Sequence, residues 1–230
     1  MAAARIFAVV PAAGRGTRFG ADTPKQYVQI AGVPVLSHTL DLLLSIPALS
    51  SLYLVVAGDD QQWRSCQPAN DSRVHIVSGG DTRARSVANG LAALAGTASA
   101  EDWVLVHDVA RPCCPLTDIL RLIDELADDA VGGLLALPVS DTVKQADSER
   151  RVAATLDRDR IWLAQTPQLF RYGVLRQALA RSPDVTDEAA AIEAAGLAPR
   201  LIAGSVRNLK ITRAEDLSLA AFYLQQDQPS

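Results

Sequence analysis

A chain of 230 residues with 49% hydrophobic and 21% charged residues can bury a substantial core and is not composed like a disordered protein. Its formal net charge of -4 argues against non-specific nucleic-acid binding, for which a basic face is expected. The three cysteines (Cys66, Cys113 and Cys114) are odd in number and form no CxxC pair, so we expect neither a disulfide framework nor a zinc site.

The first apolar segment predicts a buried strand and not a targeting sequence. Residues 5–10, "RIFAVV", end at Pro11 and lead directly into a glycine-rich loop. No uninterrupted apolar stretch approaches the length of a membrane span. We therefore expect a cytoplasmic protein that needs no membrane.

Apolar strands then alternate with amphipathic helices. We expect strands at 5–10, 52–57, 74–77, 103–107 and 132–139. We expect helices over 35–45 (Val35, Leu36, Leu40, Leu43 and Leu44 on one stripe), around Val87, Leu91 and Leu94 up to Gly96, and over 116–128 (Leu116, Ile119, Leu120, Ile123 and Leu126 inward). The alternation predicts an α/β domain with a largely parallel sheet. Ligands of such sheets bind beyond the carboxyl ends of the strands, where the loops at Pro11, Gly79 and Asp108 begin.

Residues 139–160 interrupt this rhythm. Two short β-like pieces, 142–145 and 151–156, flank a charged turn and predict a protruding hairpin. It is either a solvated loop or an arm that reaches another subunit, because an isolated two-stranded ribbon is marginally stable. Composition does not decide between the two.

The C-terminal part returns to the α/β pattern. Thr186, with Asp187 and Glu188, opens a short helix that Gly196 closes, and segments 200–204 and 208–211 are strand-like. Thr212 and Glu215 predict a capping box for a last helix that runs to Leu224.

The loop after the first strand carries glycines and cations. Gly14 and Gly16 allow backbone N–H groups to approach an anion, but Phe19 stands where a dinucleotide fingerprint needs its last glycine, and the GK[ST] of a Walker loop is absent. Arg18 and Lys25 could flank a triphosphate from two sides. The alternative is a flexible surface loop with solvated cations.

Polar groups follow two other strands. After Gly79 and Gly80, Asp81 is either a helix N-cap or an acceptor for the amine of a base, with Arg83 and Ser86 beside it. Asp108 and Arg111 are either an ordinary surface pair or groups that hold a substrate hydroxyl, a magnesium-bound phosphate or a second phosphate.

Each of the remaining polar residues, taken alone, is weak evidence for a binding site. His107 is expected to be structural, Cys113 and Cys114 to be packing residues, and Lys210 to lie either on a solvated strand face or in a phosphate pocket. Arg18, Lys25, Arg111 and Lys210 together surround strand ends in a way that suits two phosphorylated molecules. Phosphoryl or nucleotidyl transfer mainly needs such positioning and charge.

The order of motifs carries a resemblance. "PAAGRGTRFGADTPKQY" (11–27), "GGDTRARSV" (79–87), "HDVARP" (107–112), "DTVK" (141–144), "TPQ" (166–168), "TDEAAAIE" (186–193) and "NLKITRAEDL" (208–217) resemble the 2-C-methyl-D-erythritol 4-phosphate cytidylyltransferases over Arg5–Leu224. The resemblance implies a Rossmann-like nucleotidyltransferase fold over residues 1–230, with a mostly parallel central sheet flanked by helices and with 139–160 as a dimerisation arm. Because no extension follows, we expect no fused cyclase domain.

The resemblance also assigns roles to residues. It implies transition-state stabilisation by Arg18 and Lys25, and CTP binding by Pro11, Ala12, Ala13, Gly14, Gly16, Gly80, Asp81, Ser86 and Val109. Val109 stands where the family usually has alanine. The sugar-alcohol phosphate is assigned to Asp108, Arg111, Thr186 and Lys210, together with Thr142, Arg158 and Thr166, which are expected to act in the partner's active site.

The implied reaction is attack of the 4-phosphate oxygen of methylerythritol phosphate on the α-phosphorus of CTP, with release of pyrophosphate. Mg²⁺ is expected as cofactor, bound mainly through the CTP phosphates, with Asp108 as the candidate protein group near it, and the protein is expected to be a homodimer. The nearest alternative is a cytidylyltransferase for another sugar-alcohol phosphate such as ribitol 5-phosphate. A nucleotide-cofactor oxidoreductase is disfavoured by Phe19, and a non-catalytic subunit by the presence of Arg18, Lys25, Asp108 and Lys210.

Overall fold

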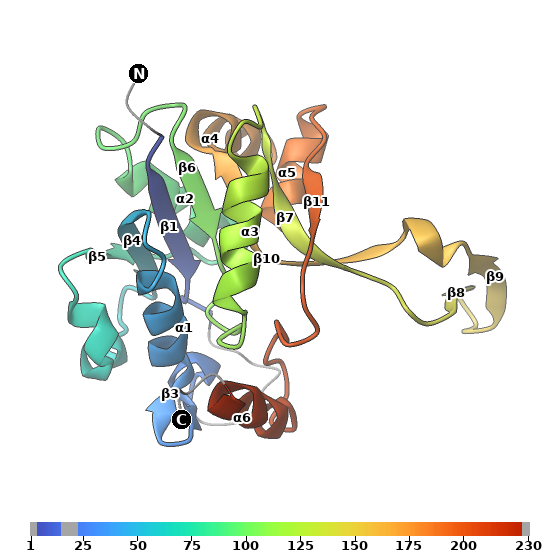
Figure 1. Ribbon diagram of the computed structural model, residues 1–230, viewed down its shortest axis with the longest axis horizontal. Coiled ribbons are helices and arrows are strands. Elements are labelled where there is room, and N and C mark those ends of the chain that lie inside the picture. Colours follow the sequence, from blue (N-terminus) through green and yellow to red (C-terminus); the bar gives the residue numbers. More distant parts are fainter. Residues whose placement is uncertain (1–3, 15–22, 227–230) are drawn as a thin grey trace.

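The central element is a seven-stranded sheet (Figure 1). The structure, a computed structural model, describes residues 4–14 and 23–226. The strand order is β11-β7-β10-β6-β1-β4-β5. The bounds are β1 Ile6–Pro11, β4 Leu49–Val56, β5 Val74–Ser78, β6 Trp103–Val106, β7 Gly132–Pro138, β10 Trp162–Arg171 and β11 Arg200–Ala203. Only β10 runs antiparallel to its neighbours among these strands, so the predicted mostly parallel sheet is confirmed.

Helices cover both faces of this sheet. α1 (Val35–Leu44) and α3 (Leu116–Leu126) share one apolar cluster with Ile6, Ala8 and Val10 of β1. The other face holds Phe7 and Val9 with α2 (Arg83–Ala93), α4 (Tyr172–Arg181) and α5 (Glu188–Ala194). Because both faces of β1 are buried, its sequence is a continuous apolar run and does not alternate.

A third, smaller cluster lies below the carboxyl edge of the sheet. The ribbon of β2 (Gln29–Ile30) and β3 (Val33–Pro34) packs with α6 (Asp216–Gln226) around Ile30, Ala110, Cys113, Ile211 and Ala220. The Ile211 N–H donates to the carbonyl of Ala110 at 2.8 Å. This contact ties the loop that follows β6 to the segment that contains Lys210.

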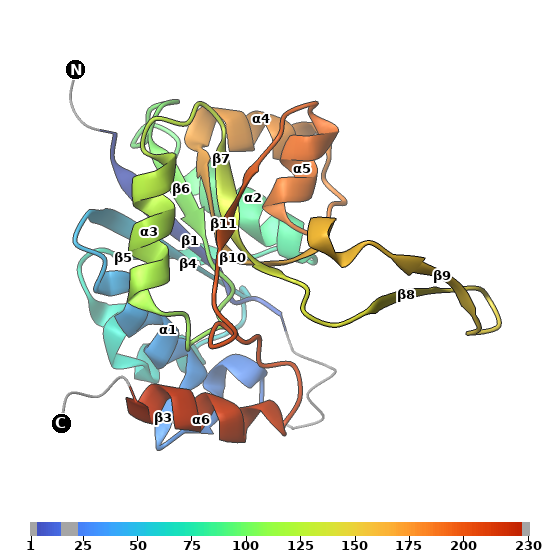
Figure 2. The same cartoon turned by 45° about the vertical axis from the view of Figure 1, so that its right-hand side comes forward.

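The hairpin is present and stands apart from the main sheet. β8 (Val143–Ala146) and β9 (Val152–Leu156) form a separate antiparallel sheet that extends from the body in both views (Figures 1 and 2). Two of its large apolar residues are exposed, Val152 at 65% and Leu156 at 39%. A ribbon with apolar side chains in solvent needs a cover, and the described chain does not supply one.

Three local predictions are wrong. Segment 208–211 is not a strand, because it pairs with no neighbour in the sheet. The capping group is Asp216, the first residue of α6, whose carboxylate accepts from the N–H groups of Thr212 and Arg213; it is not Glu215. In α3 the buried face is centred on Ile119, Leu122 and Leu126, so Leu120 is only half-buried.

β10 and α4 were not predicted. The strand contains Pro167 and the polar residues Gln165, Thr166 and Gln168, so it shows no apolar run. These polar side chains are nevertheless buried, because each finds a hydrogen-bond partner in another part of the chain.

The cysteines are buried and free, as expected. None of the helices in 4–14 and 23–226 is long and apolar enough to cross a bilayer.

Candidate active site

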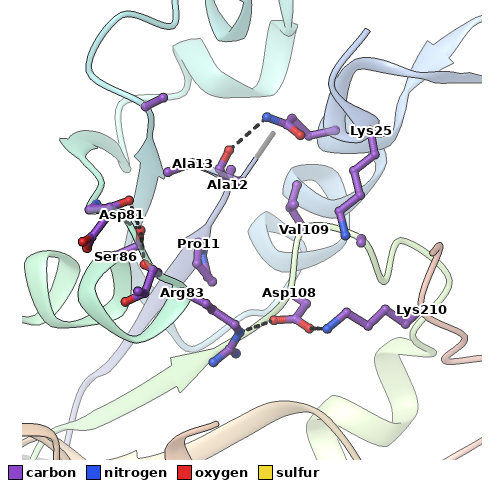
Figure 3. A pocket seen from close by; sticks show the side chains of 16 residues that line it. Pro11, Ala12, Ala13, Lys25, Asp81, Arg83, Ser86, Asp108, Val109 and Lys210 are labelled. Carbon is purple, nitrogen blue, oxygen red and sulfur yellow. Dashed lines mark hydrogen bonds and ion pairs between the residues drawn. The ribbon is translucent and has the colours of Figure 1, made fainter. Parts of the chain in front are cut away.

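A pocket of about 530 Å³ opens at the carboxyl ends of β1 and β6, next to the start of α2 (Figure 3). Its lining comes from the loops after β1, β4, β5 and β6 and from Lys210. It includes Pro11, Ala12, Ala13, Gly14, Lys25, Gly80, Asp81, Ser86, Asp108, Val109 and Lys210 of the predicted site residues. The structure therefore brings together groups that are far apart in the sequence, at the edge where an α/β sheet binds ligands.

The first loop is held close to the sheet edge. The Ala12 N–H donates to the carbonyl of Val55 at 2.7 Å, and the side chain of Gln26 donates to the carbonyl of Ala12 at 3.0 Å. Gln26 is buried and lines the pocket, a role that the sequence did not indicate. Lys25 precedes it and points into the pocket (Figure 3). Gly16 and Arg18 lie outside the described residues.

The turn between β5 and α2 depends on its two glycines. A Cβ on Gly79 would come within 2.4 Å of the Ala13 Cβ, so only glycine lets this turn approach the first loop. The hydroxyl of Thr82 caps α2 by accepting from the Arg85 N–H at 3.1 Å, so Asp81 is not the N-cap. Asp81 is exposed at the pocket wall and remains available as an acceptor for a ligand amine.

Asp108 is buried between two cations. Its Oδ1 lies 2.8 Å from Nε of Arg83 and its Oδ2 lies 2.6 Å from Nζ of Lys210 (Figure 3). Burial alone would raise the pKa of Asp108, but the charges of Arg83 and Lys210 outweigh it and hold the pKa below its ordinary value. Arg111 forms no part of this pair; its guanidinium donates to the carbonyl of Asn208 at 2.5 Å. Of the two alternatives for Asp108 and Arg111, the ordinary surface pair is therefore wrong.

Glu188 was not predicted as a site residue, and Arg83 was considered only as a neighbour of Asp81 in the recognition of a base. The guanidinium that contacts Asp108 also donates to both carboxylate oxygens of Glu188, at 2.7 and 3.1 Å. Glu188 is fully buried at the start of α5. The only sequence signal was the position of each residue at the start of a helix, since their pairing requires α2 and α5 to meet in space.

His107 and Thr166 fix the backbone beneath Asp108. A carbonyl can only accept, so the Nε2 of His107, 3.0 Å from the carbonyl of Arg111, carries the ring proton. Burial lowers the pKa of His107 to about 4, which keeps the ring neutral at pH 7 and leaves Nδ1 as an acceptor. The Thr166 hydroxyl donates to this Nδ1 at 3.3 Å and accepts from the Asp108 N–H at 3.0 Å. The prediction that His107 is structural is confirmed.

Thr166 is thus placed in the site of its own chain. It is buried against Asp108, so the expectation that it reaches a partner's active site is wrong. Thr142 and Arg158 lie exposed at the base of the hairpin, just before β8 and just after β9. The Arg158 guanidinium donates to the carbonyl of Ser140. Thr186 is exposed in the loop before α5 and does not line the pocket, although Glu188 two residues later belongs to the charged cluster.

The described residues do not fit a magnesium site held by the protein itself. Both oxygens of Asp108 are taken by cations, and no cluster of three metal-ligating side chains occurs within 4–14 and 23–226. A carboxylate between an arginine and a lysine is a poor ligand, because the two cations already neutralise it.

The arrangement is suited to phosphorylated ligands. The backbone of the first loop and of Gly80 lines one side of the pocket, and Lys25 and Lys210 supply positive charge at the other. No described residue forms a nucleophile–base pair here, since His107 is buried and neutral. The pocket can position two phosphates and stabilise charge that develops between them.

Comparisons with known proteins agree with this geometry. The family description 2-C-methyl-D-erythritol 4-phosphate cytidylyltransferase (IspD) matches residues 6–226. The enzyme of that name from Azoarcus sp. (strain BH72) is 52% identical over 222 residues, which cover 96% of this chain and 94% of that protein. The one from Dechloromonas aromatica (strain RCB) is also 52% identical, over 96% of this chain and 98% of that protein.

Solved structures point the same way. A crystal structure of the Francisella tularensis enzyme of this name superposes with a TM-score of 0.81 at 35% identity and covers 96% of this chain and 100% of that one. A crystal structure of a 4-diphosphocytidyl-2C-methyl-D-erythritol synthase gives 0.85 at 41% identity, over 97% of this chain and 100% of that one. The chain belongs to the 2-C-methyl-D-erythritol 4-phosphate cytidylyltransferase family.

Proposed function

We propose that the protein transfers CMP from CTP to 2-C-methyl-D-erythritol 4-phosphate, giving 4-diphosphocytidyl-2-C-methyl-D-erythritol and pyrophosphate, in the non-mevalonate isoprenoid pathway. The observation that carries the proposal is one pocket in which the glycine turns of the first loop and of residues 79–80 face the Asp108–Lys210 pair. The relatives that are 52% identical to this chain are named for this activity.

The two halves of the pocket receive the two substrates. CTP lies against Pro11–Gly14 and the turn at Gly80, with Asp81 and Ser86 near the cytosine and the backbone of Val109 beside the ribose. The phosphate of the sugar alcohol lies toward Asp108 and Lys210, with Arg111 and Thr166 behind them. Separation of this kind aligns the attacking oxygen opposite the leaving pyrophosphate.

The chemical step is an in-line displacement at the α-phosphorus. The nucleophile is already an anionic phosphate oxygen, so it needs no general base; a P–O bond forms to it while the bond to pyrophosphate breaks. Lys25, together with Arg18, stabilises the charge that develops on the phosphoryl oxygens and on the leaving group. Mg²⁺ remains a proposal as a cofactor that arrives on the nucleotide phosphates, to be tested by chelation followed by metal titration.

The decisive experiment measures pyrophosphate release from CTP with methylerythritol phosphate and, separately, with ribitol 5-phosphate. We expect turnover with the first substrate to exceed turnover with the second by at least ~10²-fold, because a polyol with a different chain leaves polar groups of the pocket unpaired. Preference for ribitol 5-phosphate would overturn the proposal, although the names of the relatives do not favour that substrate.

The protein acts as a homodimer through the hairpin. Val152 and Leu156 expose apolar surface on the hairpin, as does Leu163 of β10 just after it, and Thr142 and Arg158 lie outside the pocket of their own chain. Mixing Lys25→Ala and Arg158→Ala chains tests this: a mixed dimer contains one pocket with Lys25 and an arm with Arg158, so activity returns if the arm serves the partner. No return after verified exchange of subunits would show that each chain uses its own arm.

The free cysteines suit the cytoplasmic location that we also propose.

A further inference from the structure

The two cations that hold Asp108 differ in how firmly they are themselves held. Lys210 touches the carboxylate through one ammonium, 2.6 Å from Oδ2, and 40% of its side chain is exposed. Arg83 touches Oδ1 through Nε at 2.8 Å while its two terminal nitrogens are both bound to Glu188. A planar guanidinium in a two-pronged contact is fixed in position, whereas a lysine with a single contact on a flexible stem can move away.

The charge of Glu188 keeps Arg83 in this position. Burial raises the pKa of Glu188, but the charge of Arg83 opposes this rise, and both oxygens of Glu188 accept from Arg83, as an ionised carboxylate does. Burial lowers the pKa of Arg83, but the two carboxylates outweigh it and raise the pKa, so the guanidinium stays charged. Glu188 is fully buried and lines no wall of the pocket, so it has no contact with a ligand there.

We propose that Glu188 and Arg83 are positioning residues for the phospho-alcohol half of the reaction: Arg83, locked by Glu188, holds Asp108 in place while Lys210 moves from Asp108 to the phosphate of the substrate. The proposal rests on the proposed function. Once Lys210 has moved, the Asp108 carboxylate faces a second anion, and the like charges repel each other unless a fixed cation remains on Oδ1. Arg83 is that cation.

The test is Glu188→Gln, which keeps the size of the side chain and removes its charge. Without that charge Arg83 turns toward Asp108, the nearest remaining carboxylate, and Asp108 shifts. We expect kcat/KM for methylerythritol phosphate to fall by about tenfold or more, because displacement of a positioning group by an ångström costs up to ~10²-fold. The KM for CTP should change by less than about twofold, since the glycine turns stay in place. Glu193→Gln is the matched control, on the exposed side of the same helix.

A double-mutant cycle with Lys210→Ala separates positioning from a merely structural role. If Glu188 acts through the exchange of Lys210, the two losses are not additive, because without Lys210 there is no exchange left to support. Additive losses, or equal losses toward both substrates that follow the fall in Tm, overturn the inference while the proposed function stands. A wild-type protein that releases no pyrophosphate with either phospho-alcohol overturns both.

Arg83→Lys decides the question if Glu188→Gln does not fold. It keeps a half-buried cation beside Glu188, but a single ammonium cannot hold both carboxylates in the same geometry. We expect the same selective loss toward methylerythritol phosphate, and full activity in this variant would overturn the inference.

Discussion

The Thr166 hydroxyl is the best point at which to test how the site is held. Substitution of Thr166 by valine removes one oxygen and keeps the shape of the side chain. That oxygen accepts from the Asp108 N–H at 3.0 Å and donates to Nδ1 of His107 at 3.3 Å. Thr166 is 4% exposed and His107 is fully buried, so water does not readily replace the lost partner.

The expected cost follows from the two polar atoms that lose their partner. A buried donor or acceptor left without a hydrogen bond costs about 1–3 kcal/mol. Two such atoms therefore give about 2–6 kcal/mol, and the lower end applies if the pocket admits a water to the Asp108 N–H. For a chain of this length about 2 kcal/mol corresponds to a fall in Tm of roughly 4–8 °C. The rate should fall as well, because the backbone that orients Asp108 is no longer fixed.

Urea denaturation gives the free energy of unfolding, and pyrophosphate release gives kcat/KM for each substrate. Thr166→Ser is the control, since it keeps the hydroxyl and loses only a methyl group. The reasoning is refuted if the valine variant is no less stable than the serine variant, or if its kcat/KM for methylerythritol phosphate equals that of the wild type.

The remaining predictions concern the charges of the pocket and the hairpin. Lys25→Ala should lower kcat by at least ~10²-fold with little change in Tm, by analogy with removal of one transition-state donor; near-normal turnover would remove Lys25 from the mechanism. Because Asp108 has a depressed pKa despite its burial, its ionised form contributes stability that is complete above the ordinary pKa of ~3.9 and is lost as pH falls through the lower folded value. The difference in unfolding free energy between wild type and Asp108→Asn should therefore be constant above about pH 5 and shrink toward about pH 2, and a difference that grows on acidification would contradict the assignment. If the proposed dimer forms through this surface, Val152→Glu together with Leu163→Glu should give a monomer mass in sedimentation equilibrium where the wild type gives a dimer mass, and an unchanged mass would exclude this surface from the interface.

Much of the architecture could be predicted because it depends on burial. A strand covered by helices on both faces must be apolar throughout, as β1 and β6 are, and this signal lies in consecutive residues. β10 escaped prediction because its buried polar groups are satisfied from elsewhere: Gln168 donates to Asp187 and accepts from the Ala189 N–H. Periodicity cannot reveal a polar residue whose partner lies in another part of the chain.

The sequence by itself determined the α/β class, the glycine turns at the carboxyl edge of the sheet and the family, because each is written in local runs or in the order of short motifs. The tertiary structure decided which charges meet. It placed Asp108 between Arg83 and Lys210 and not against Arg111, and it buried Glu188 behind Arg83. The physical reason is that an ion pair depends on distance in space, and Arg83 is separated from Glu188 by 105 residues until α2 and α5 pack on the same face of the sheet.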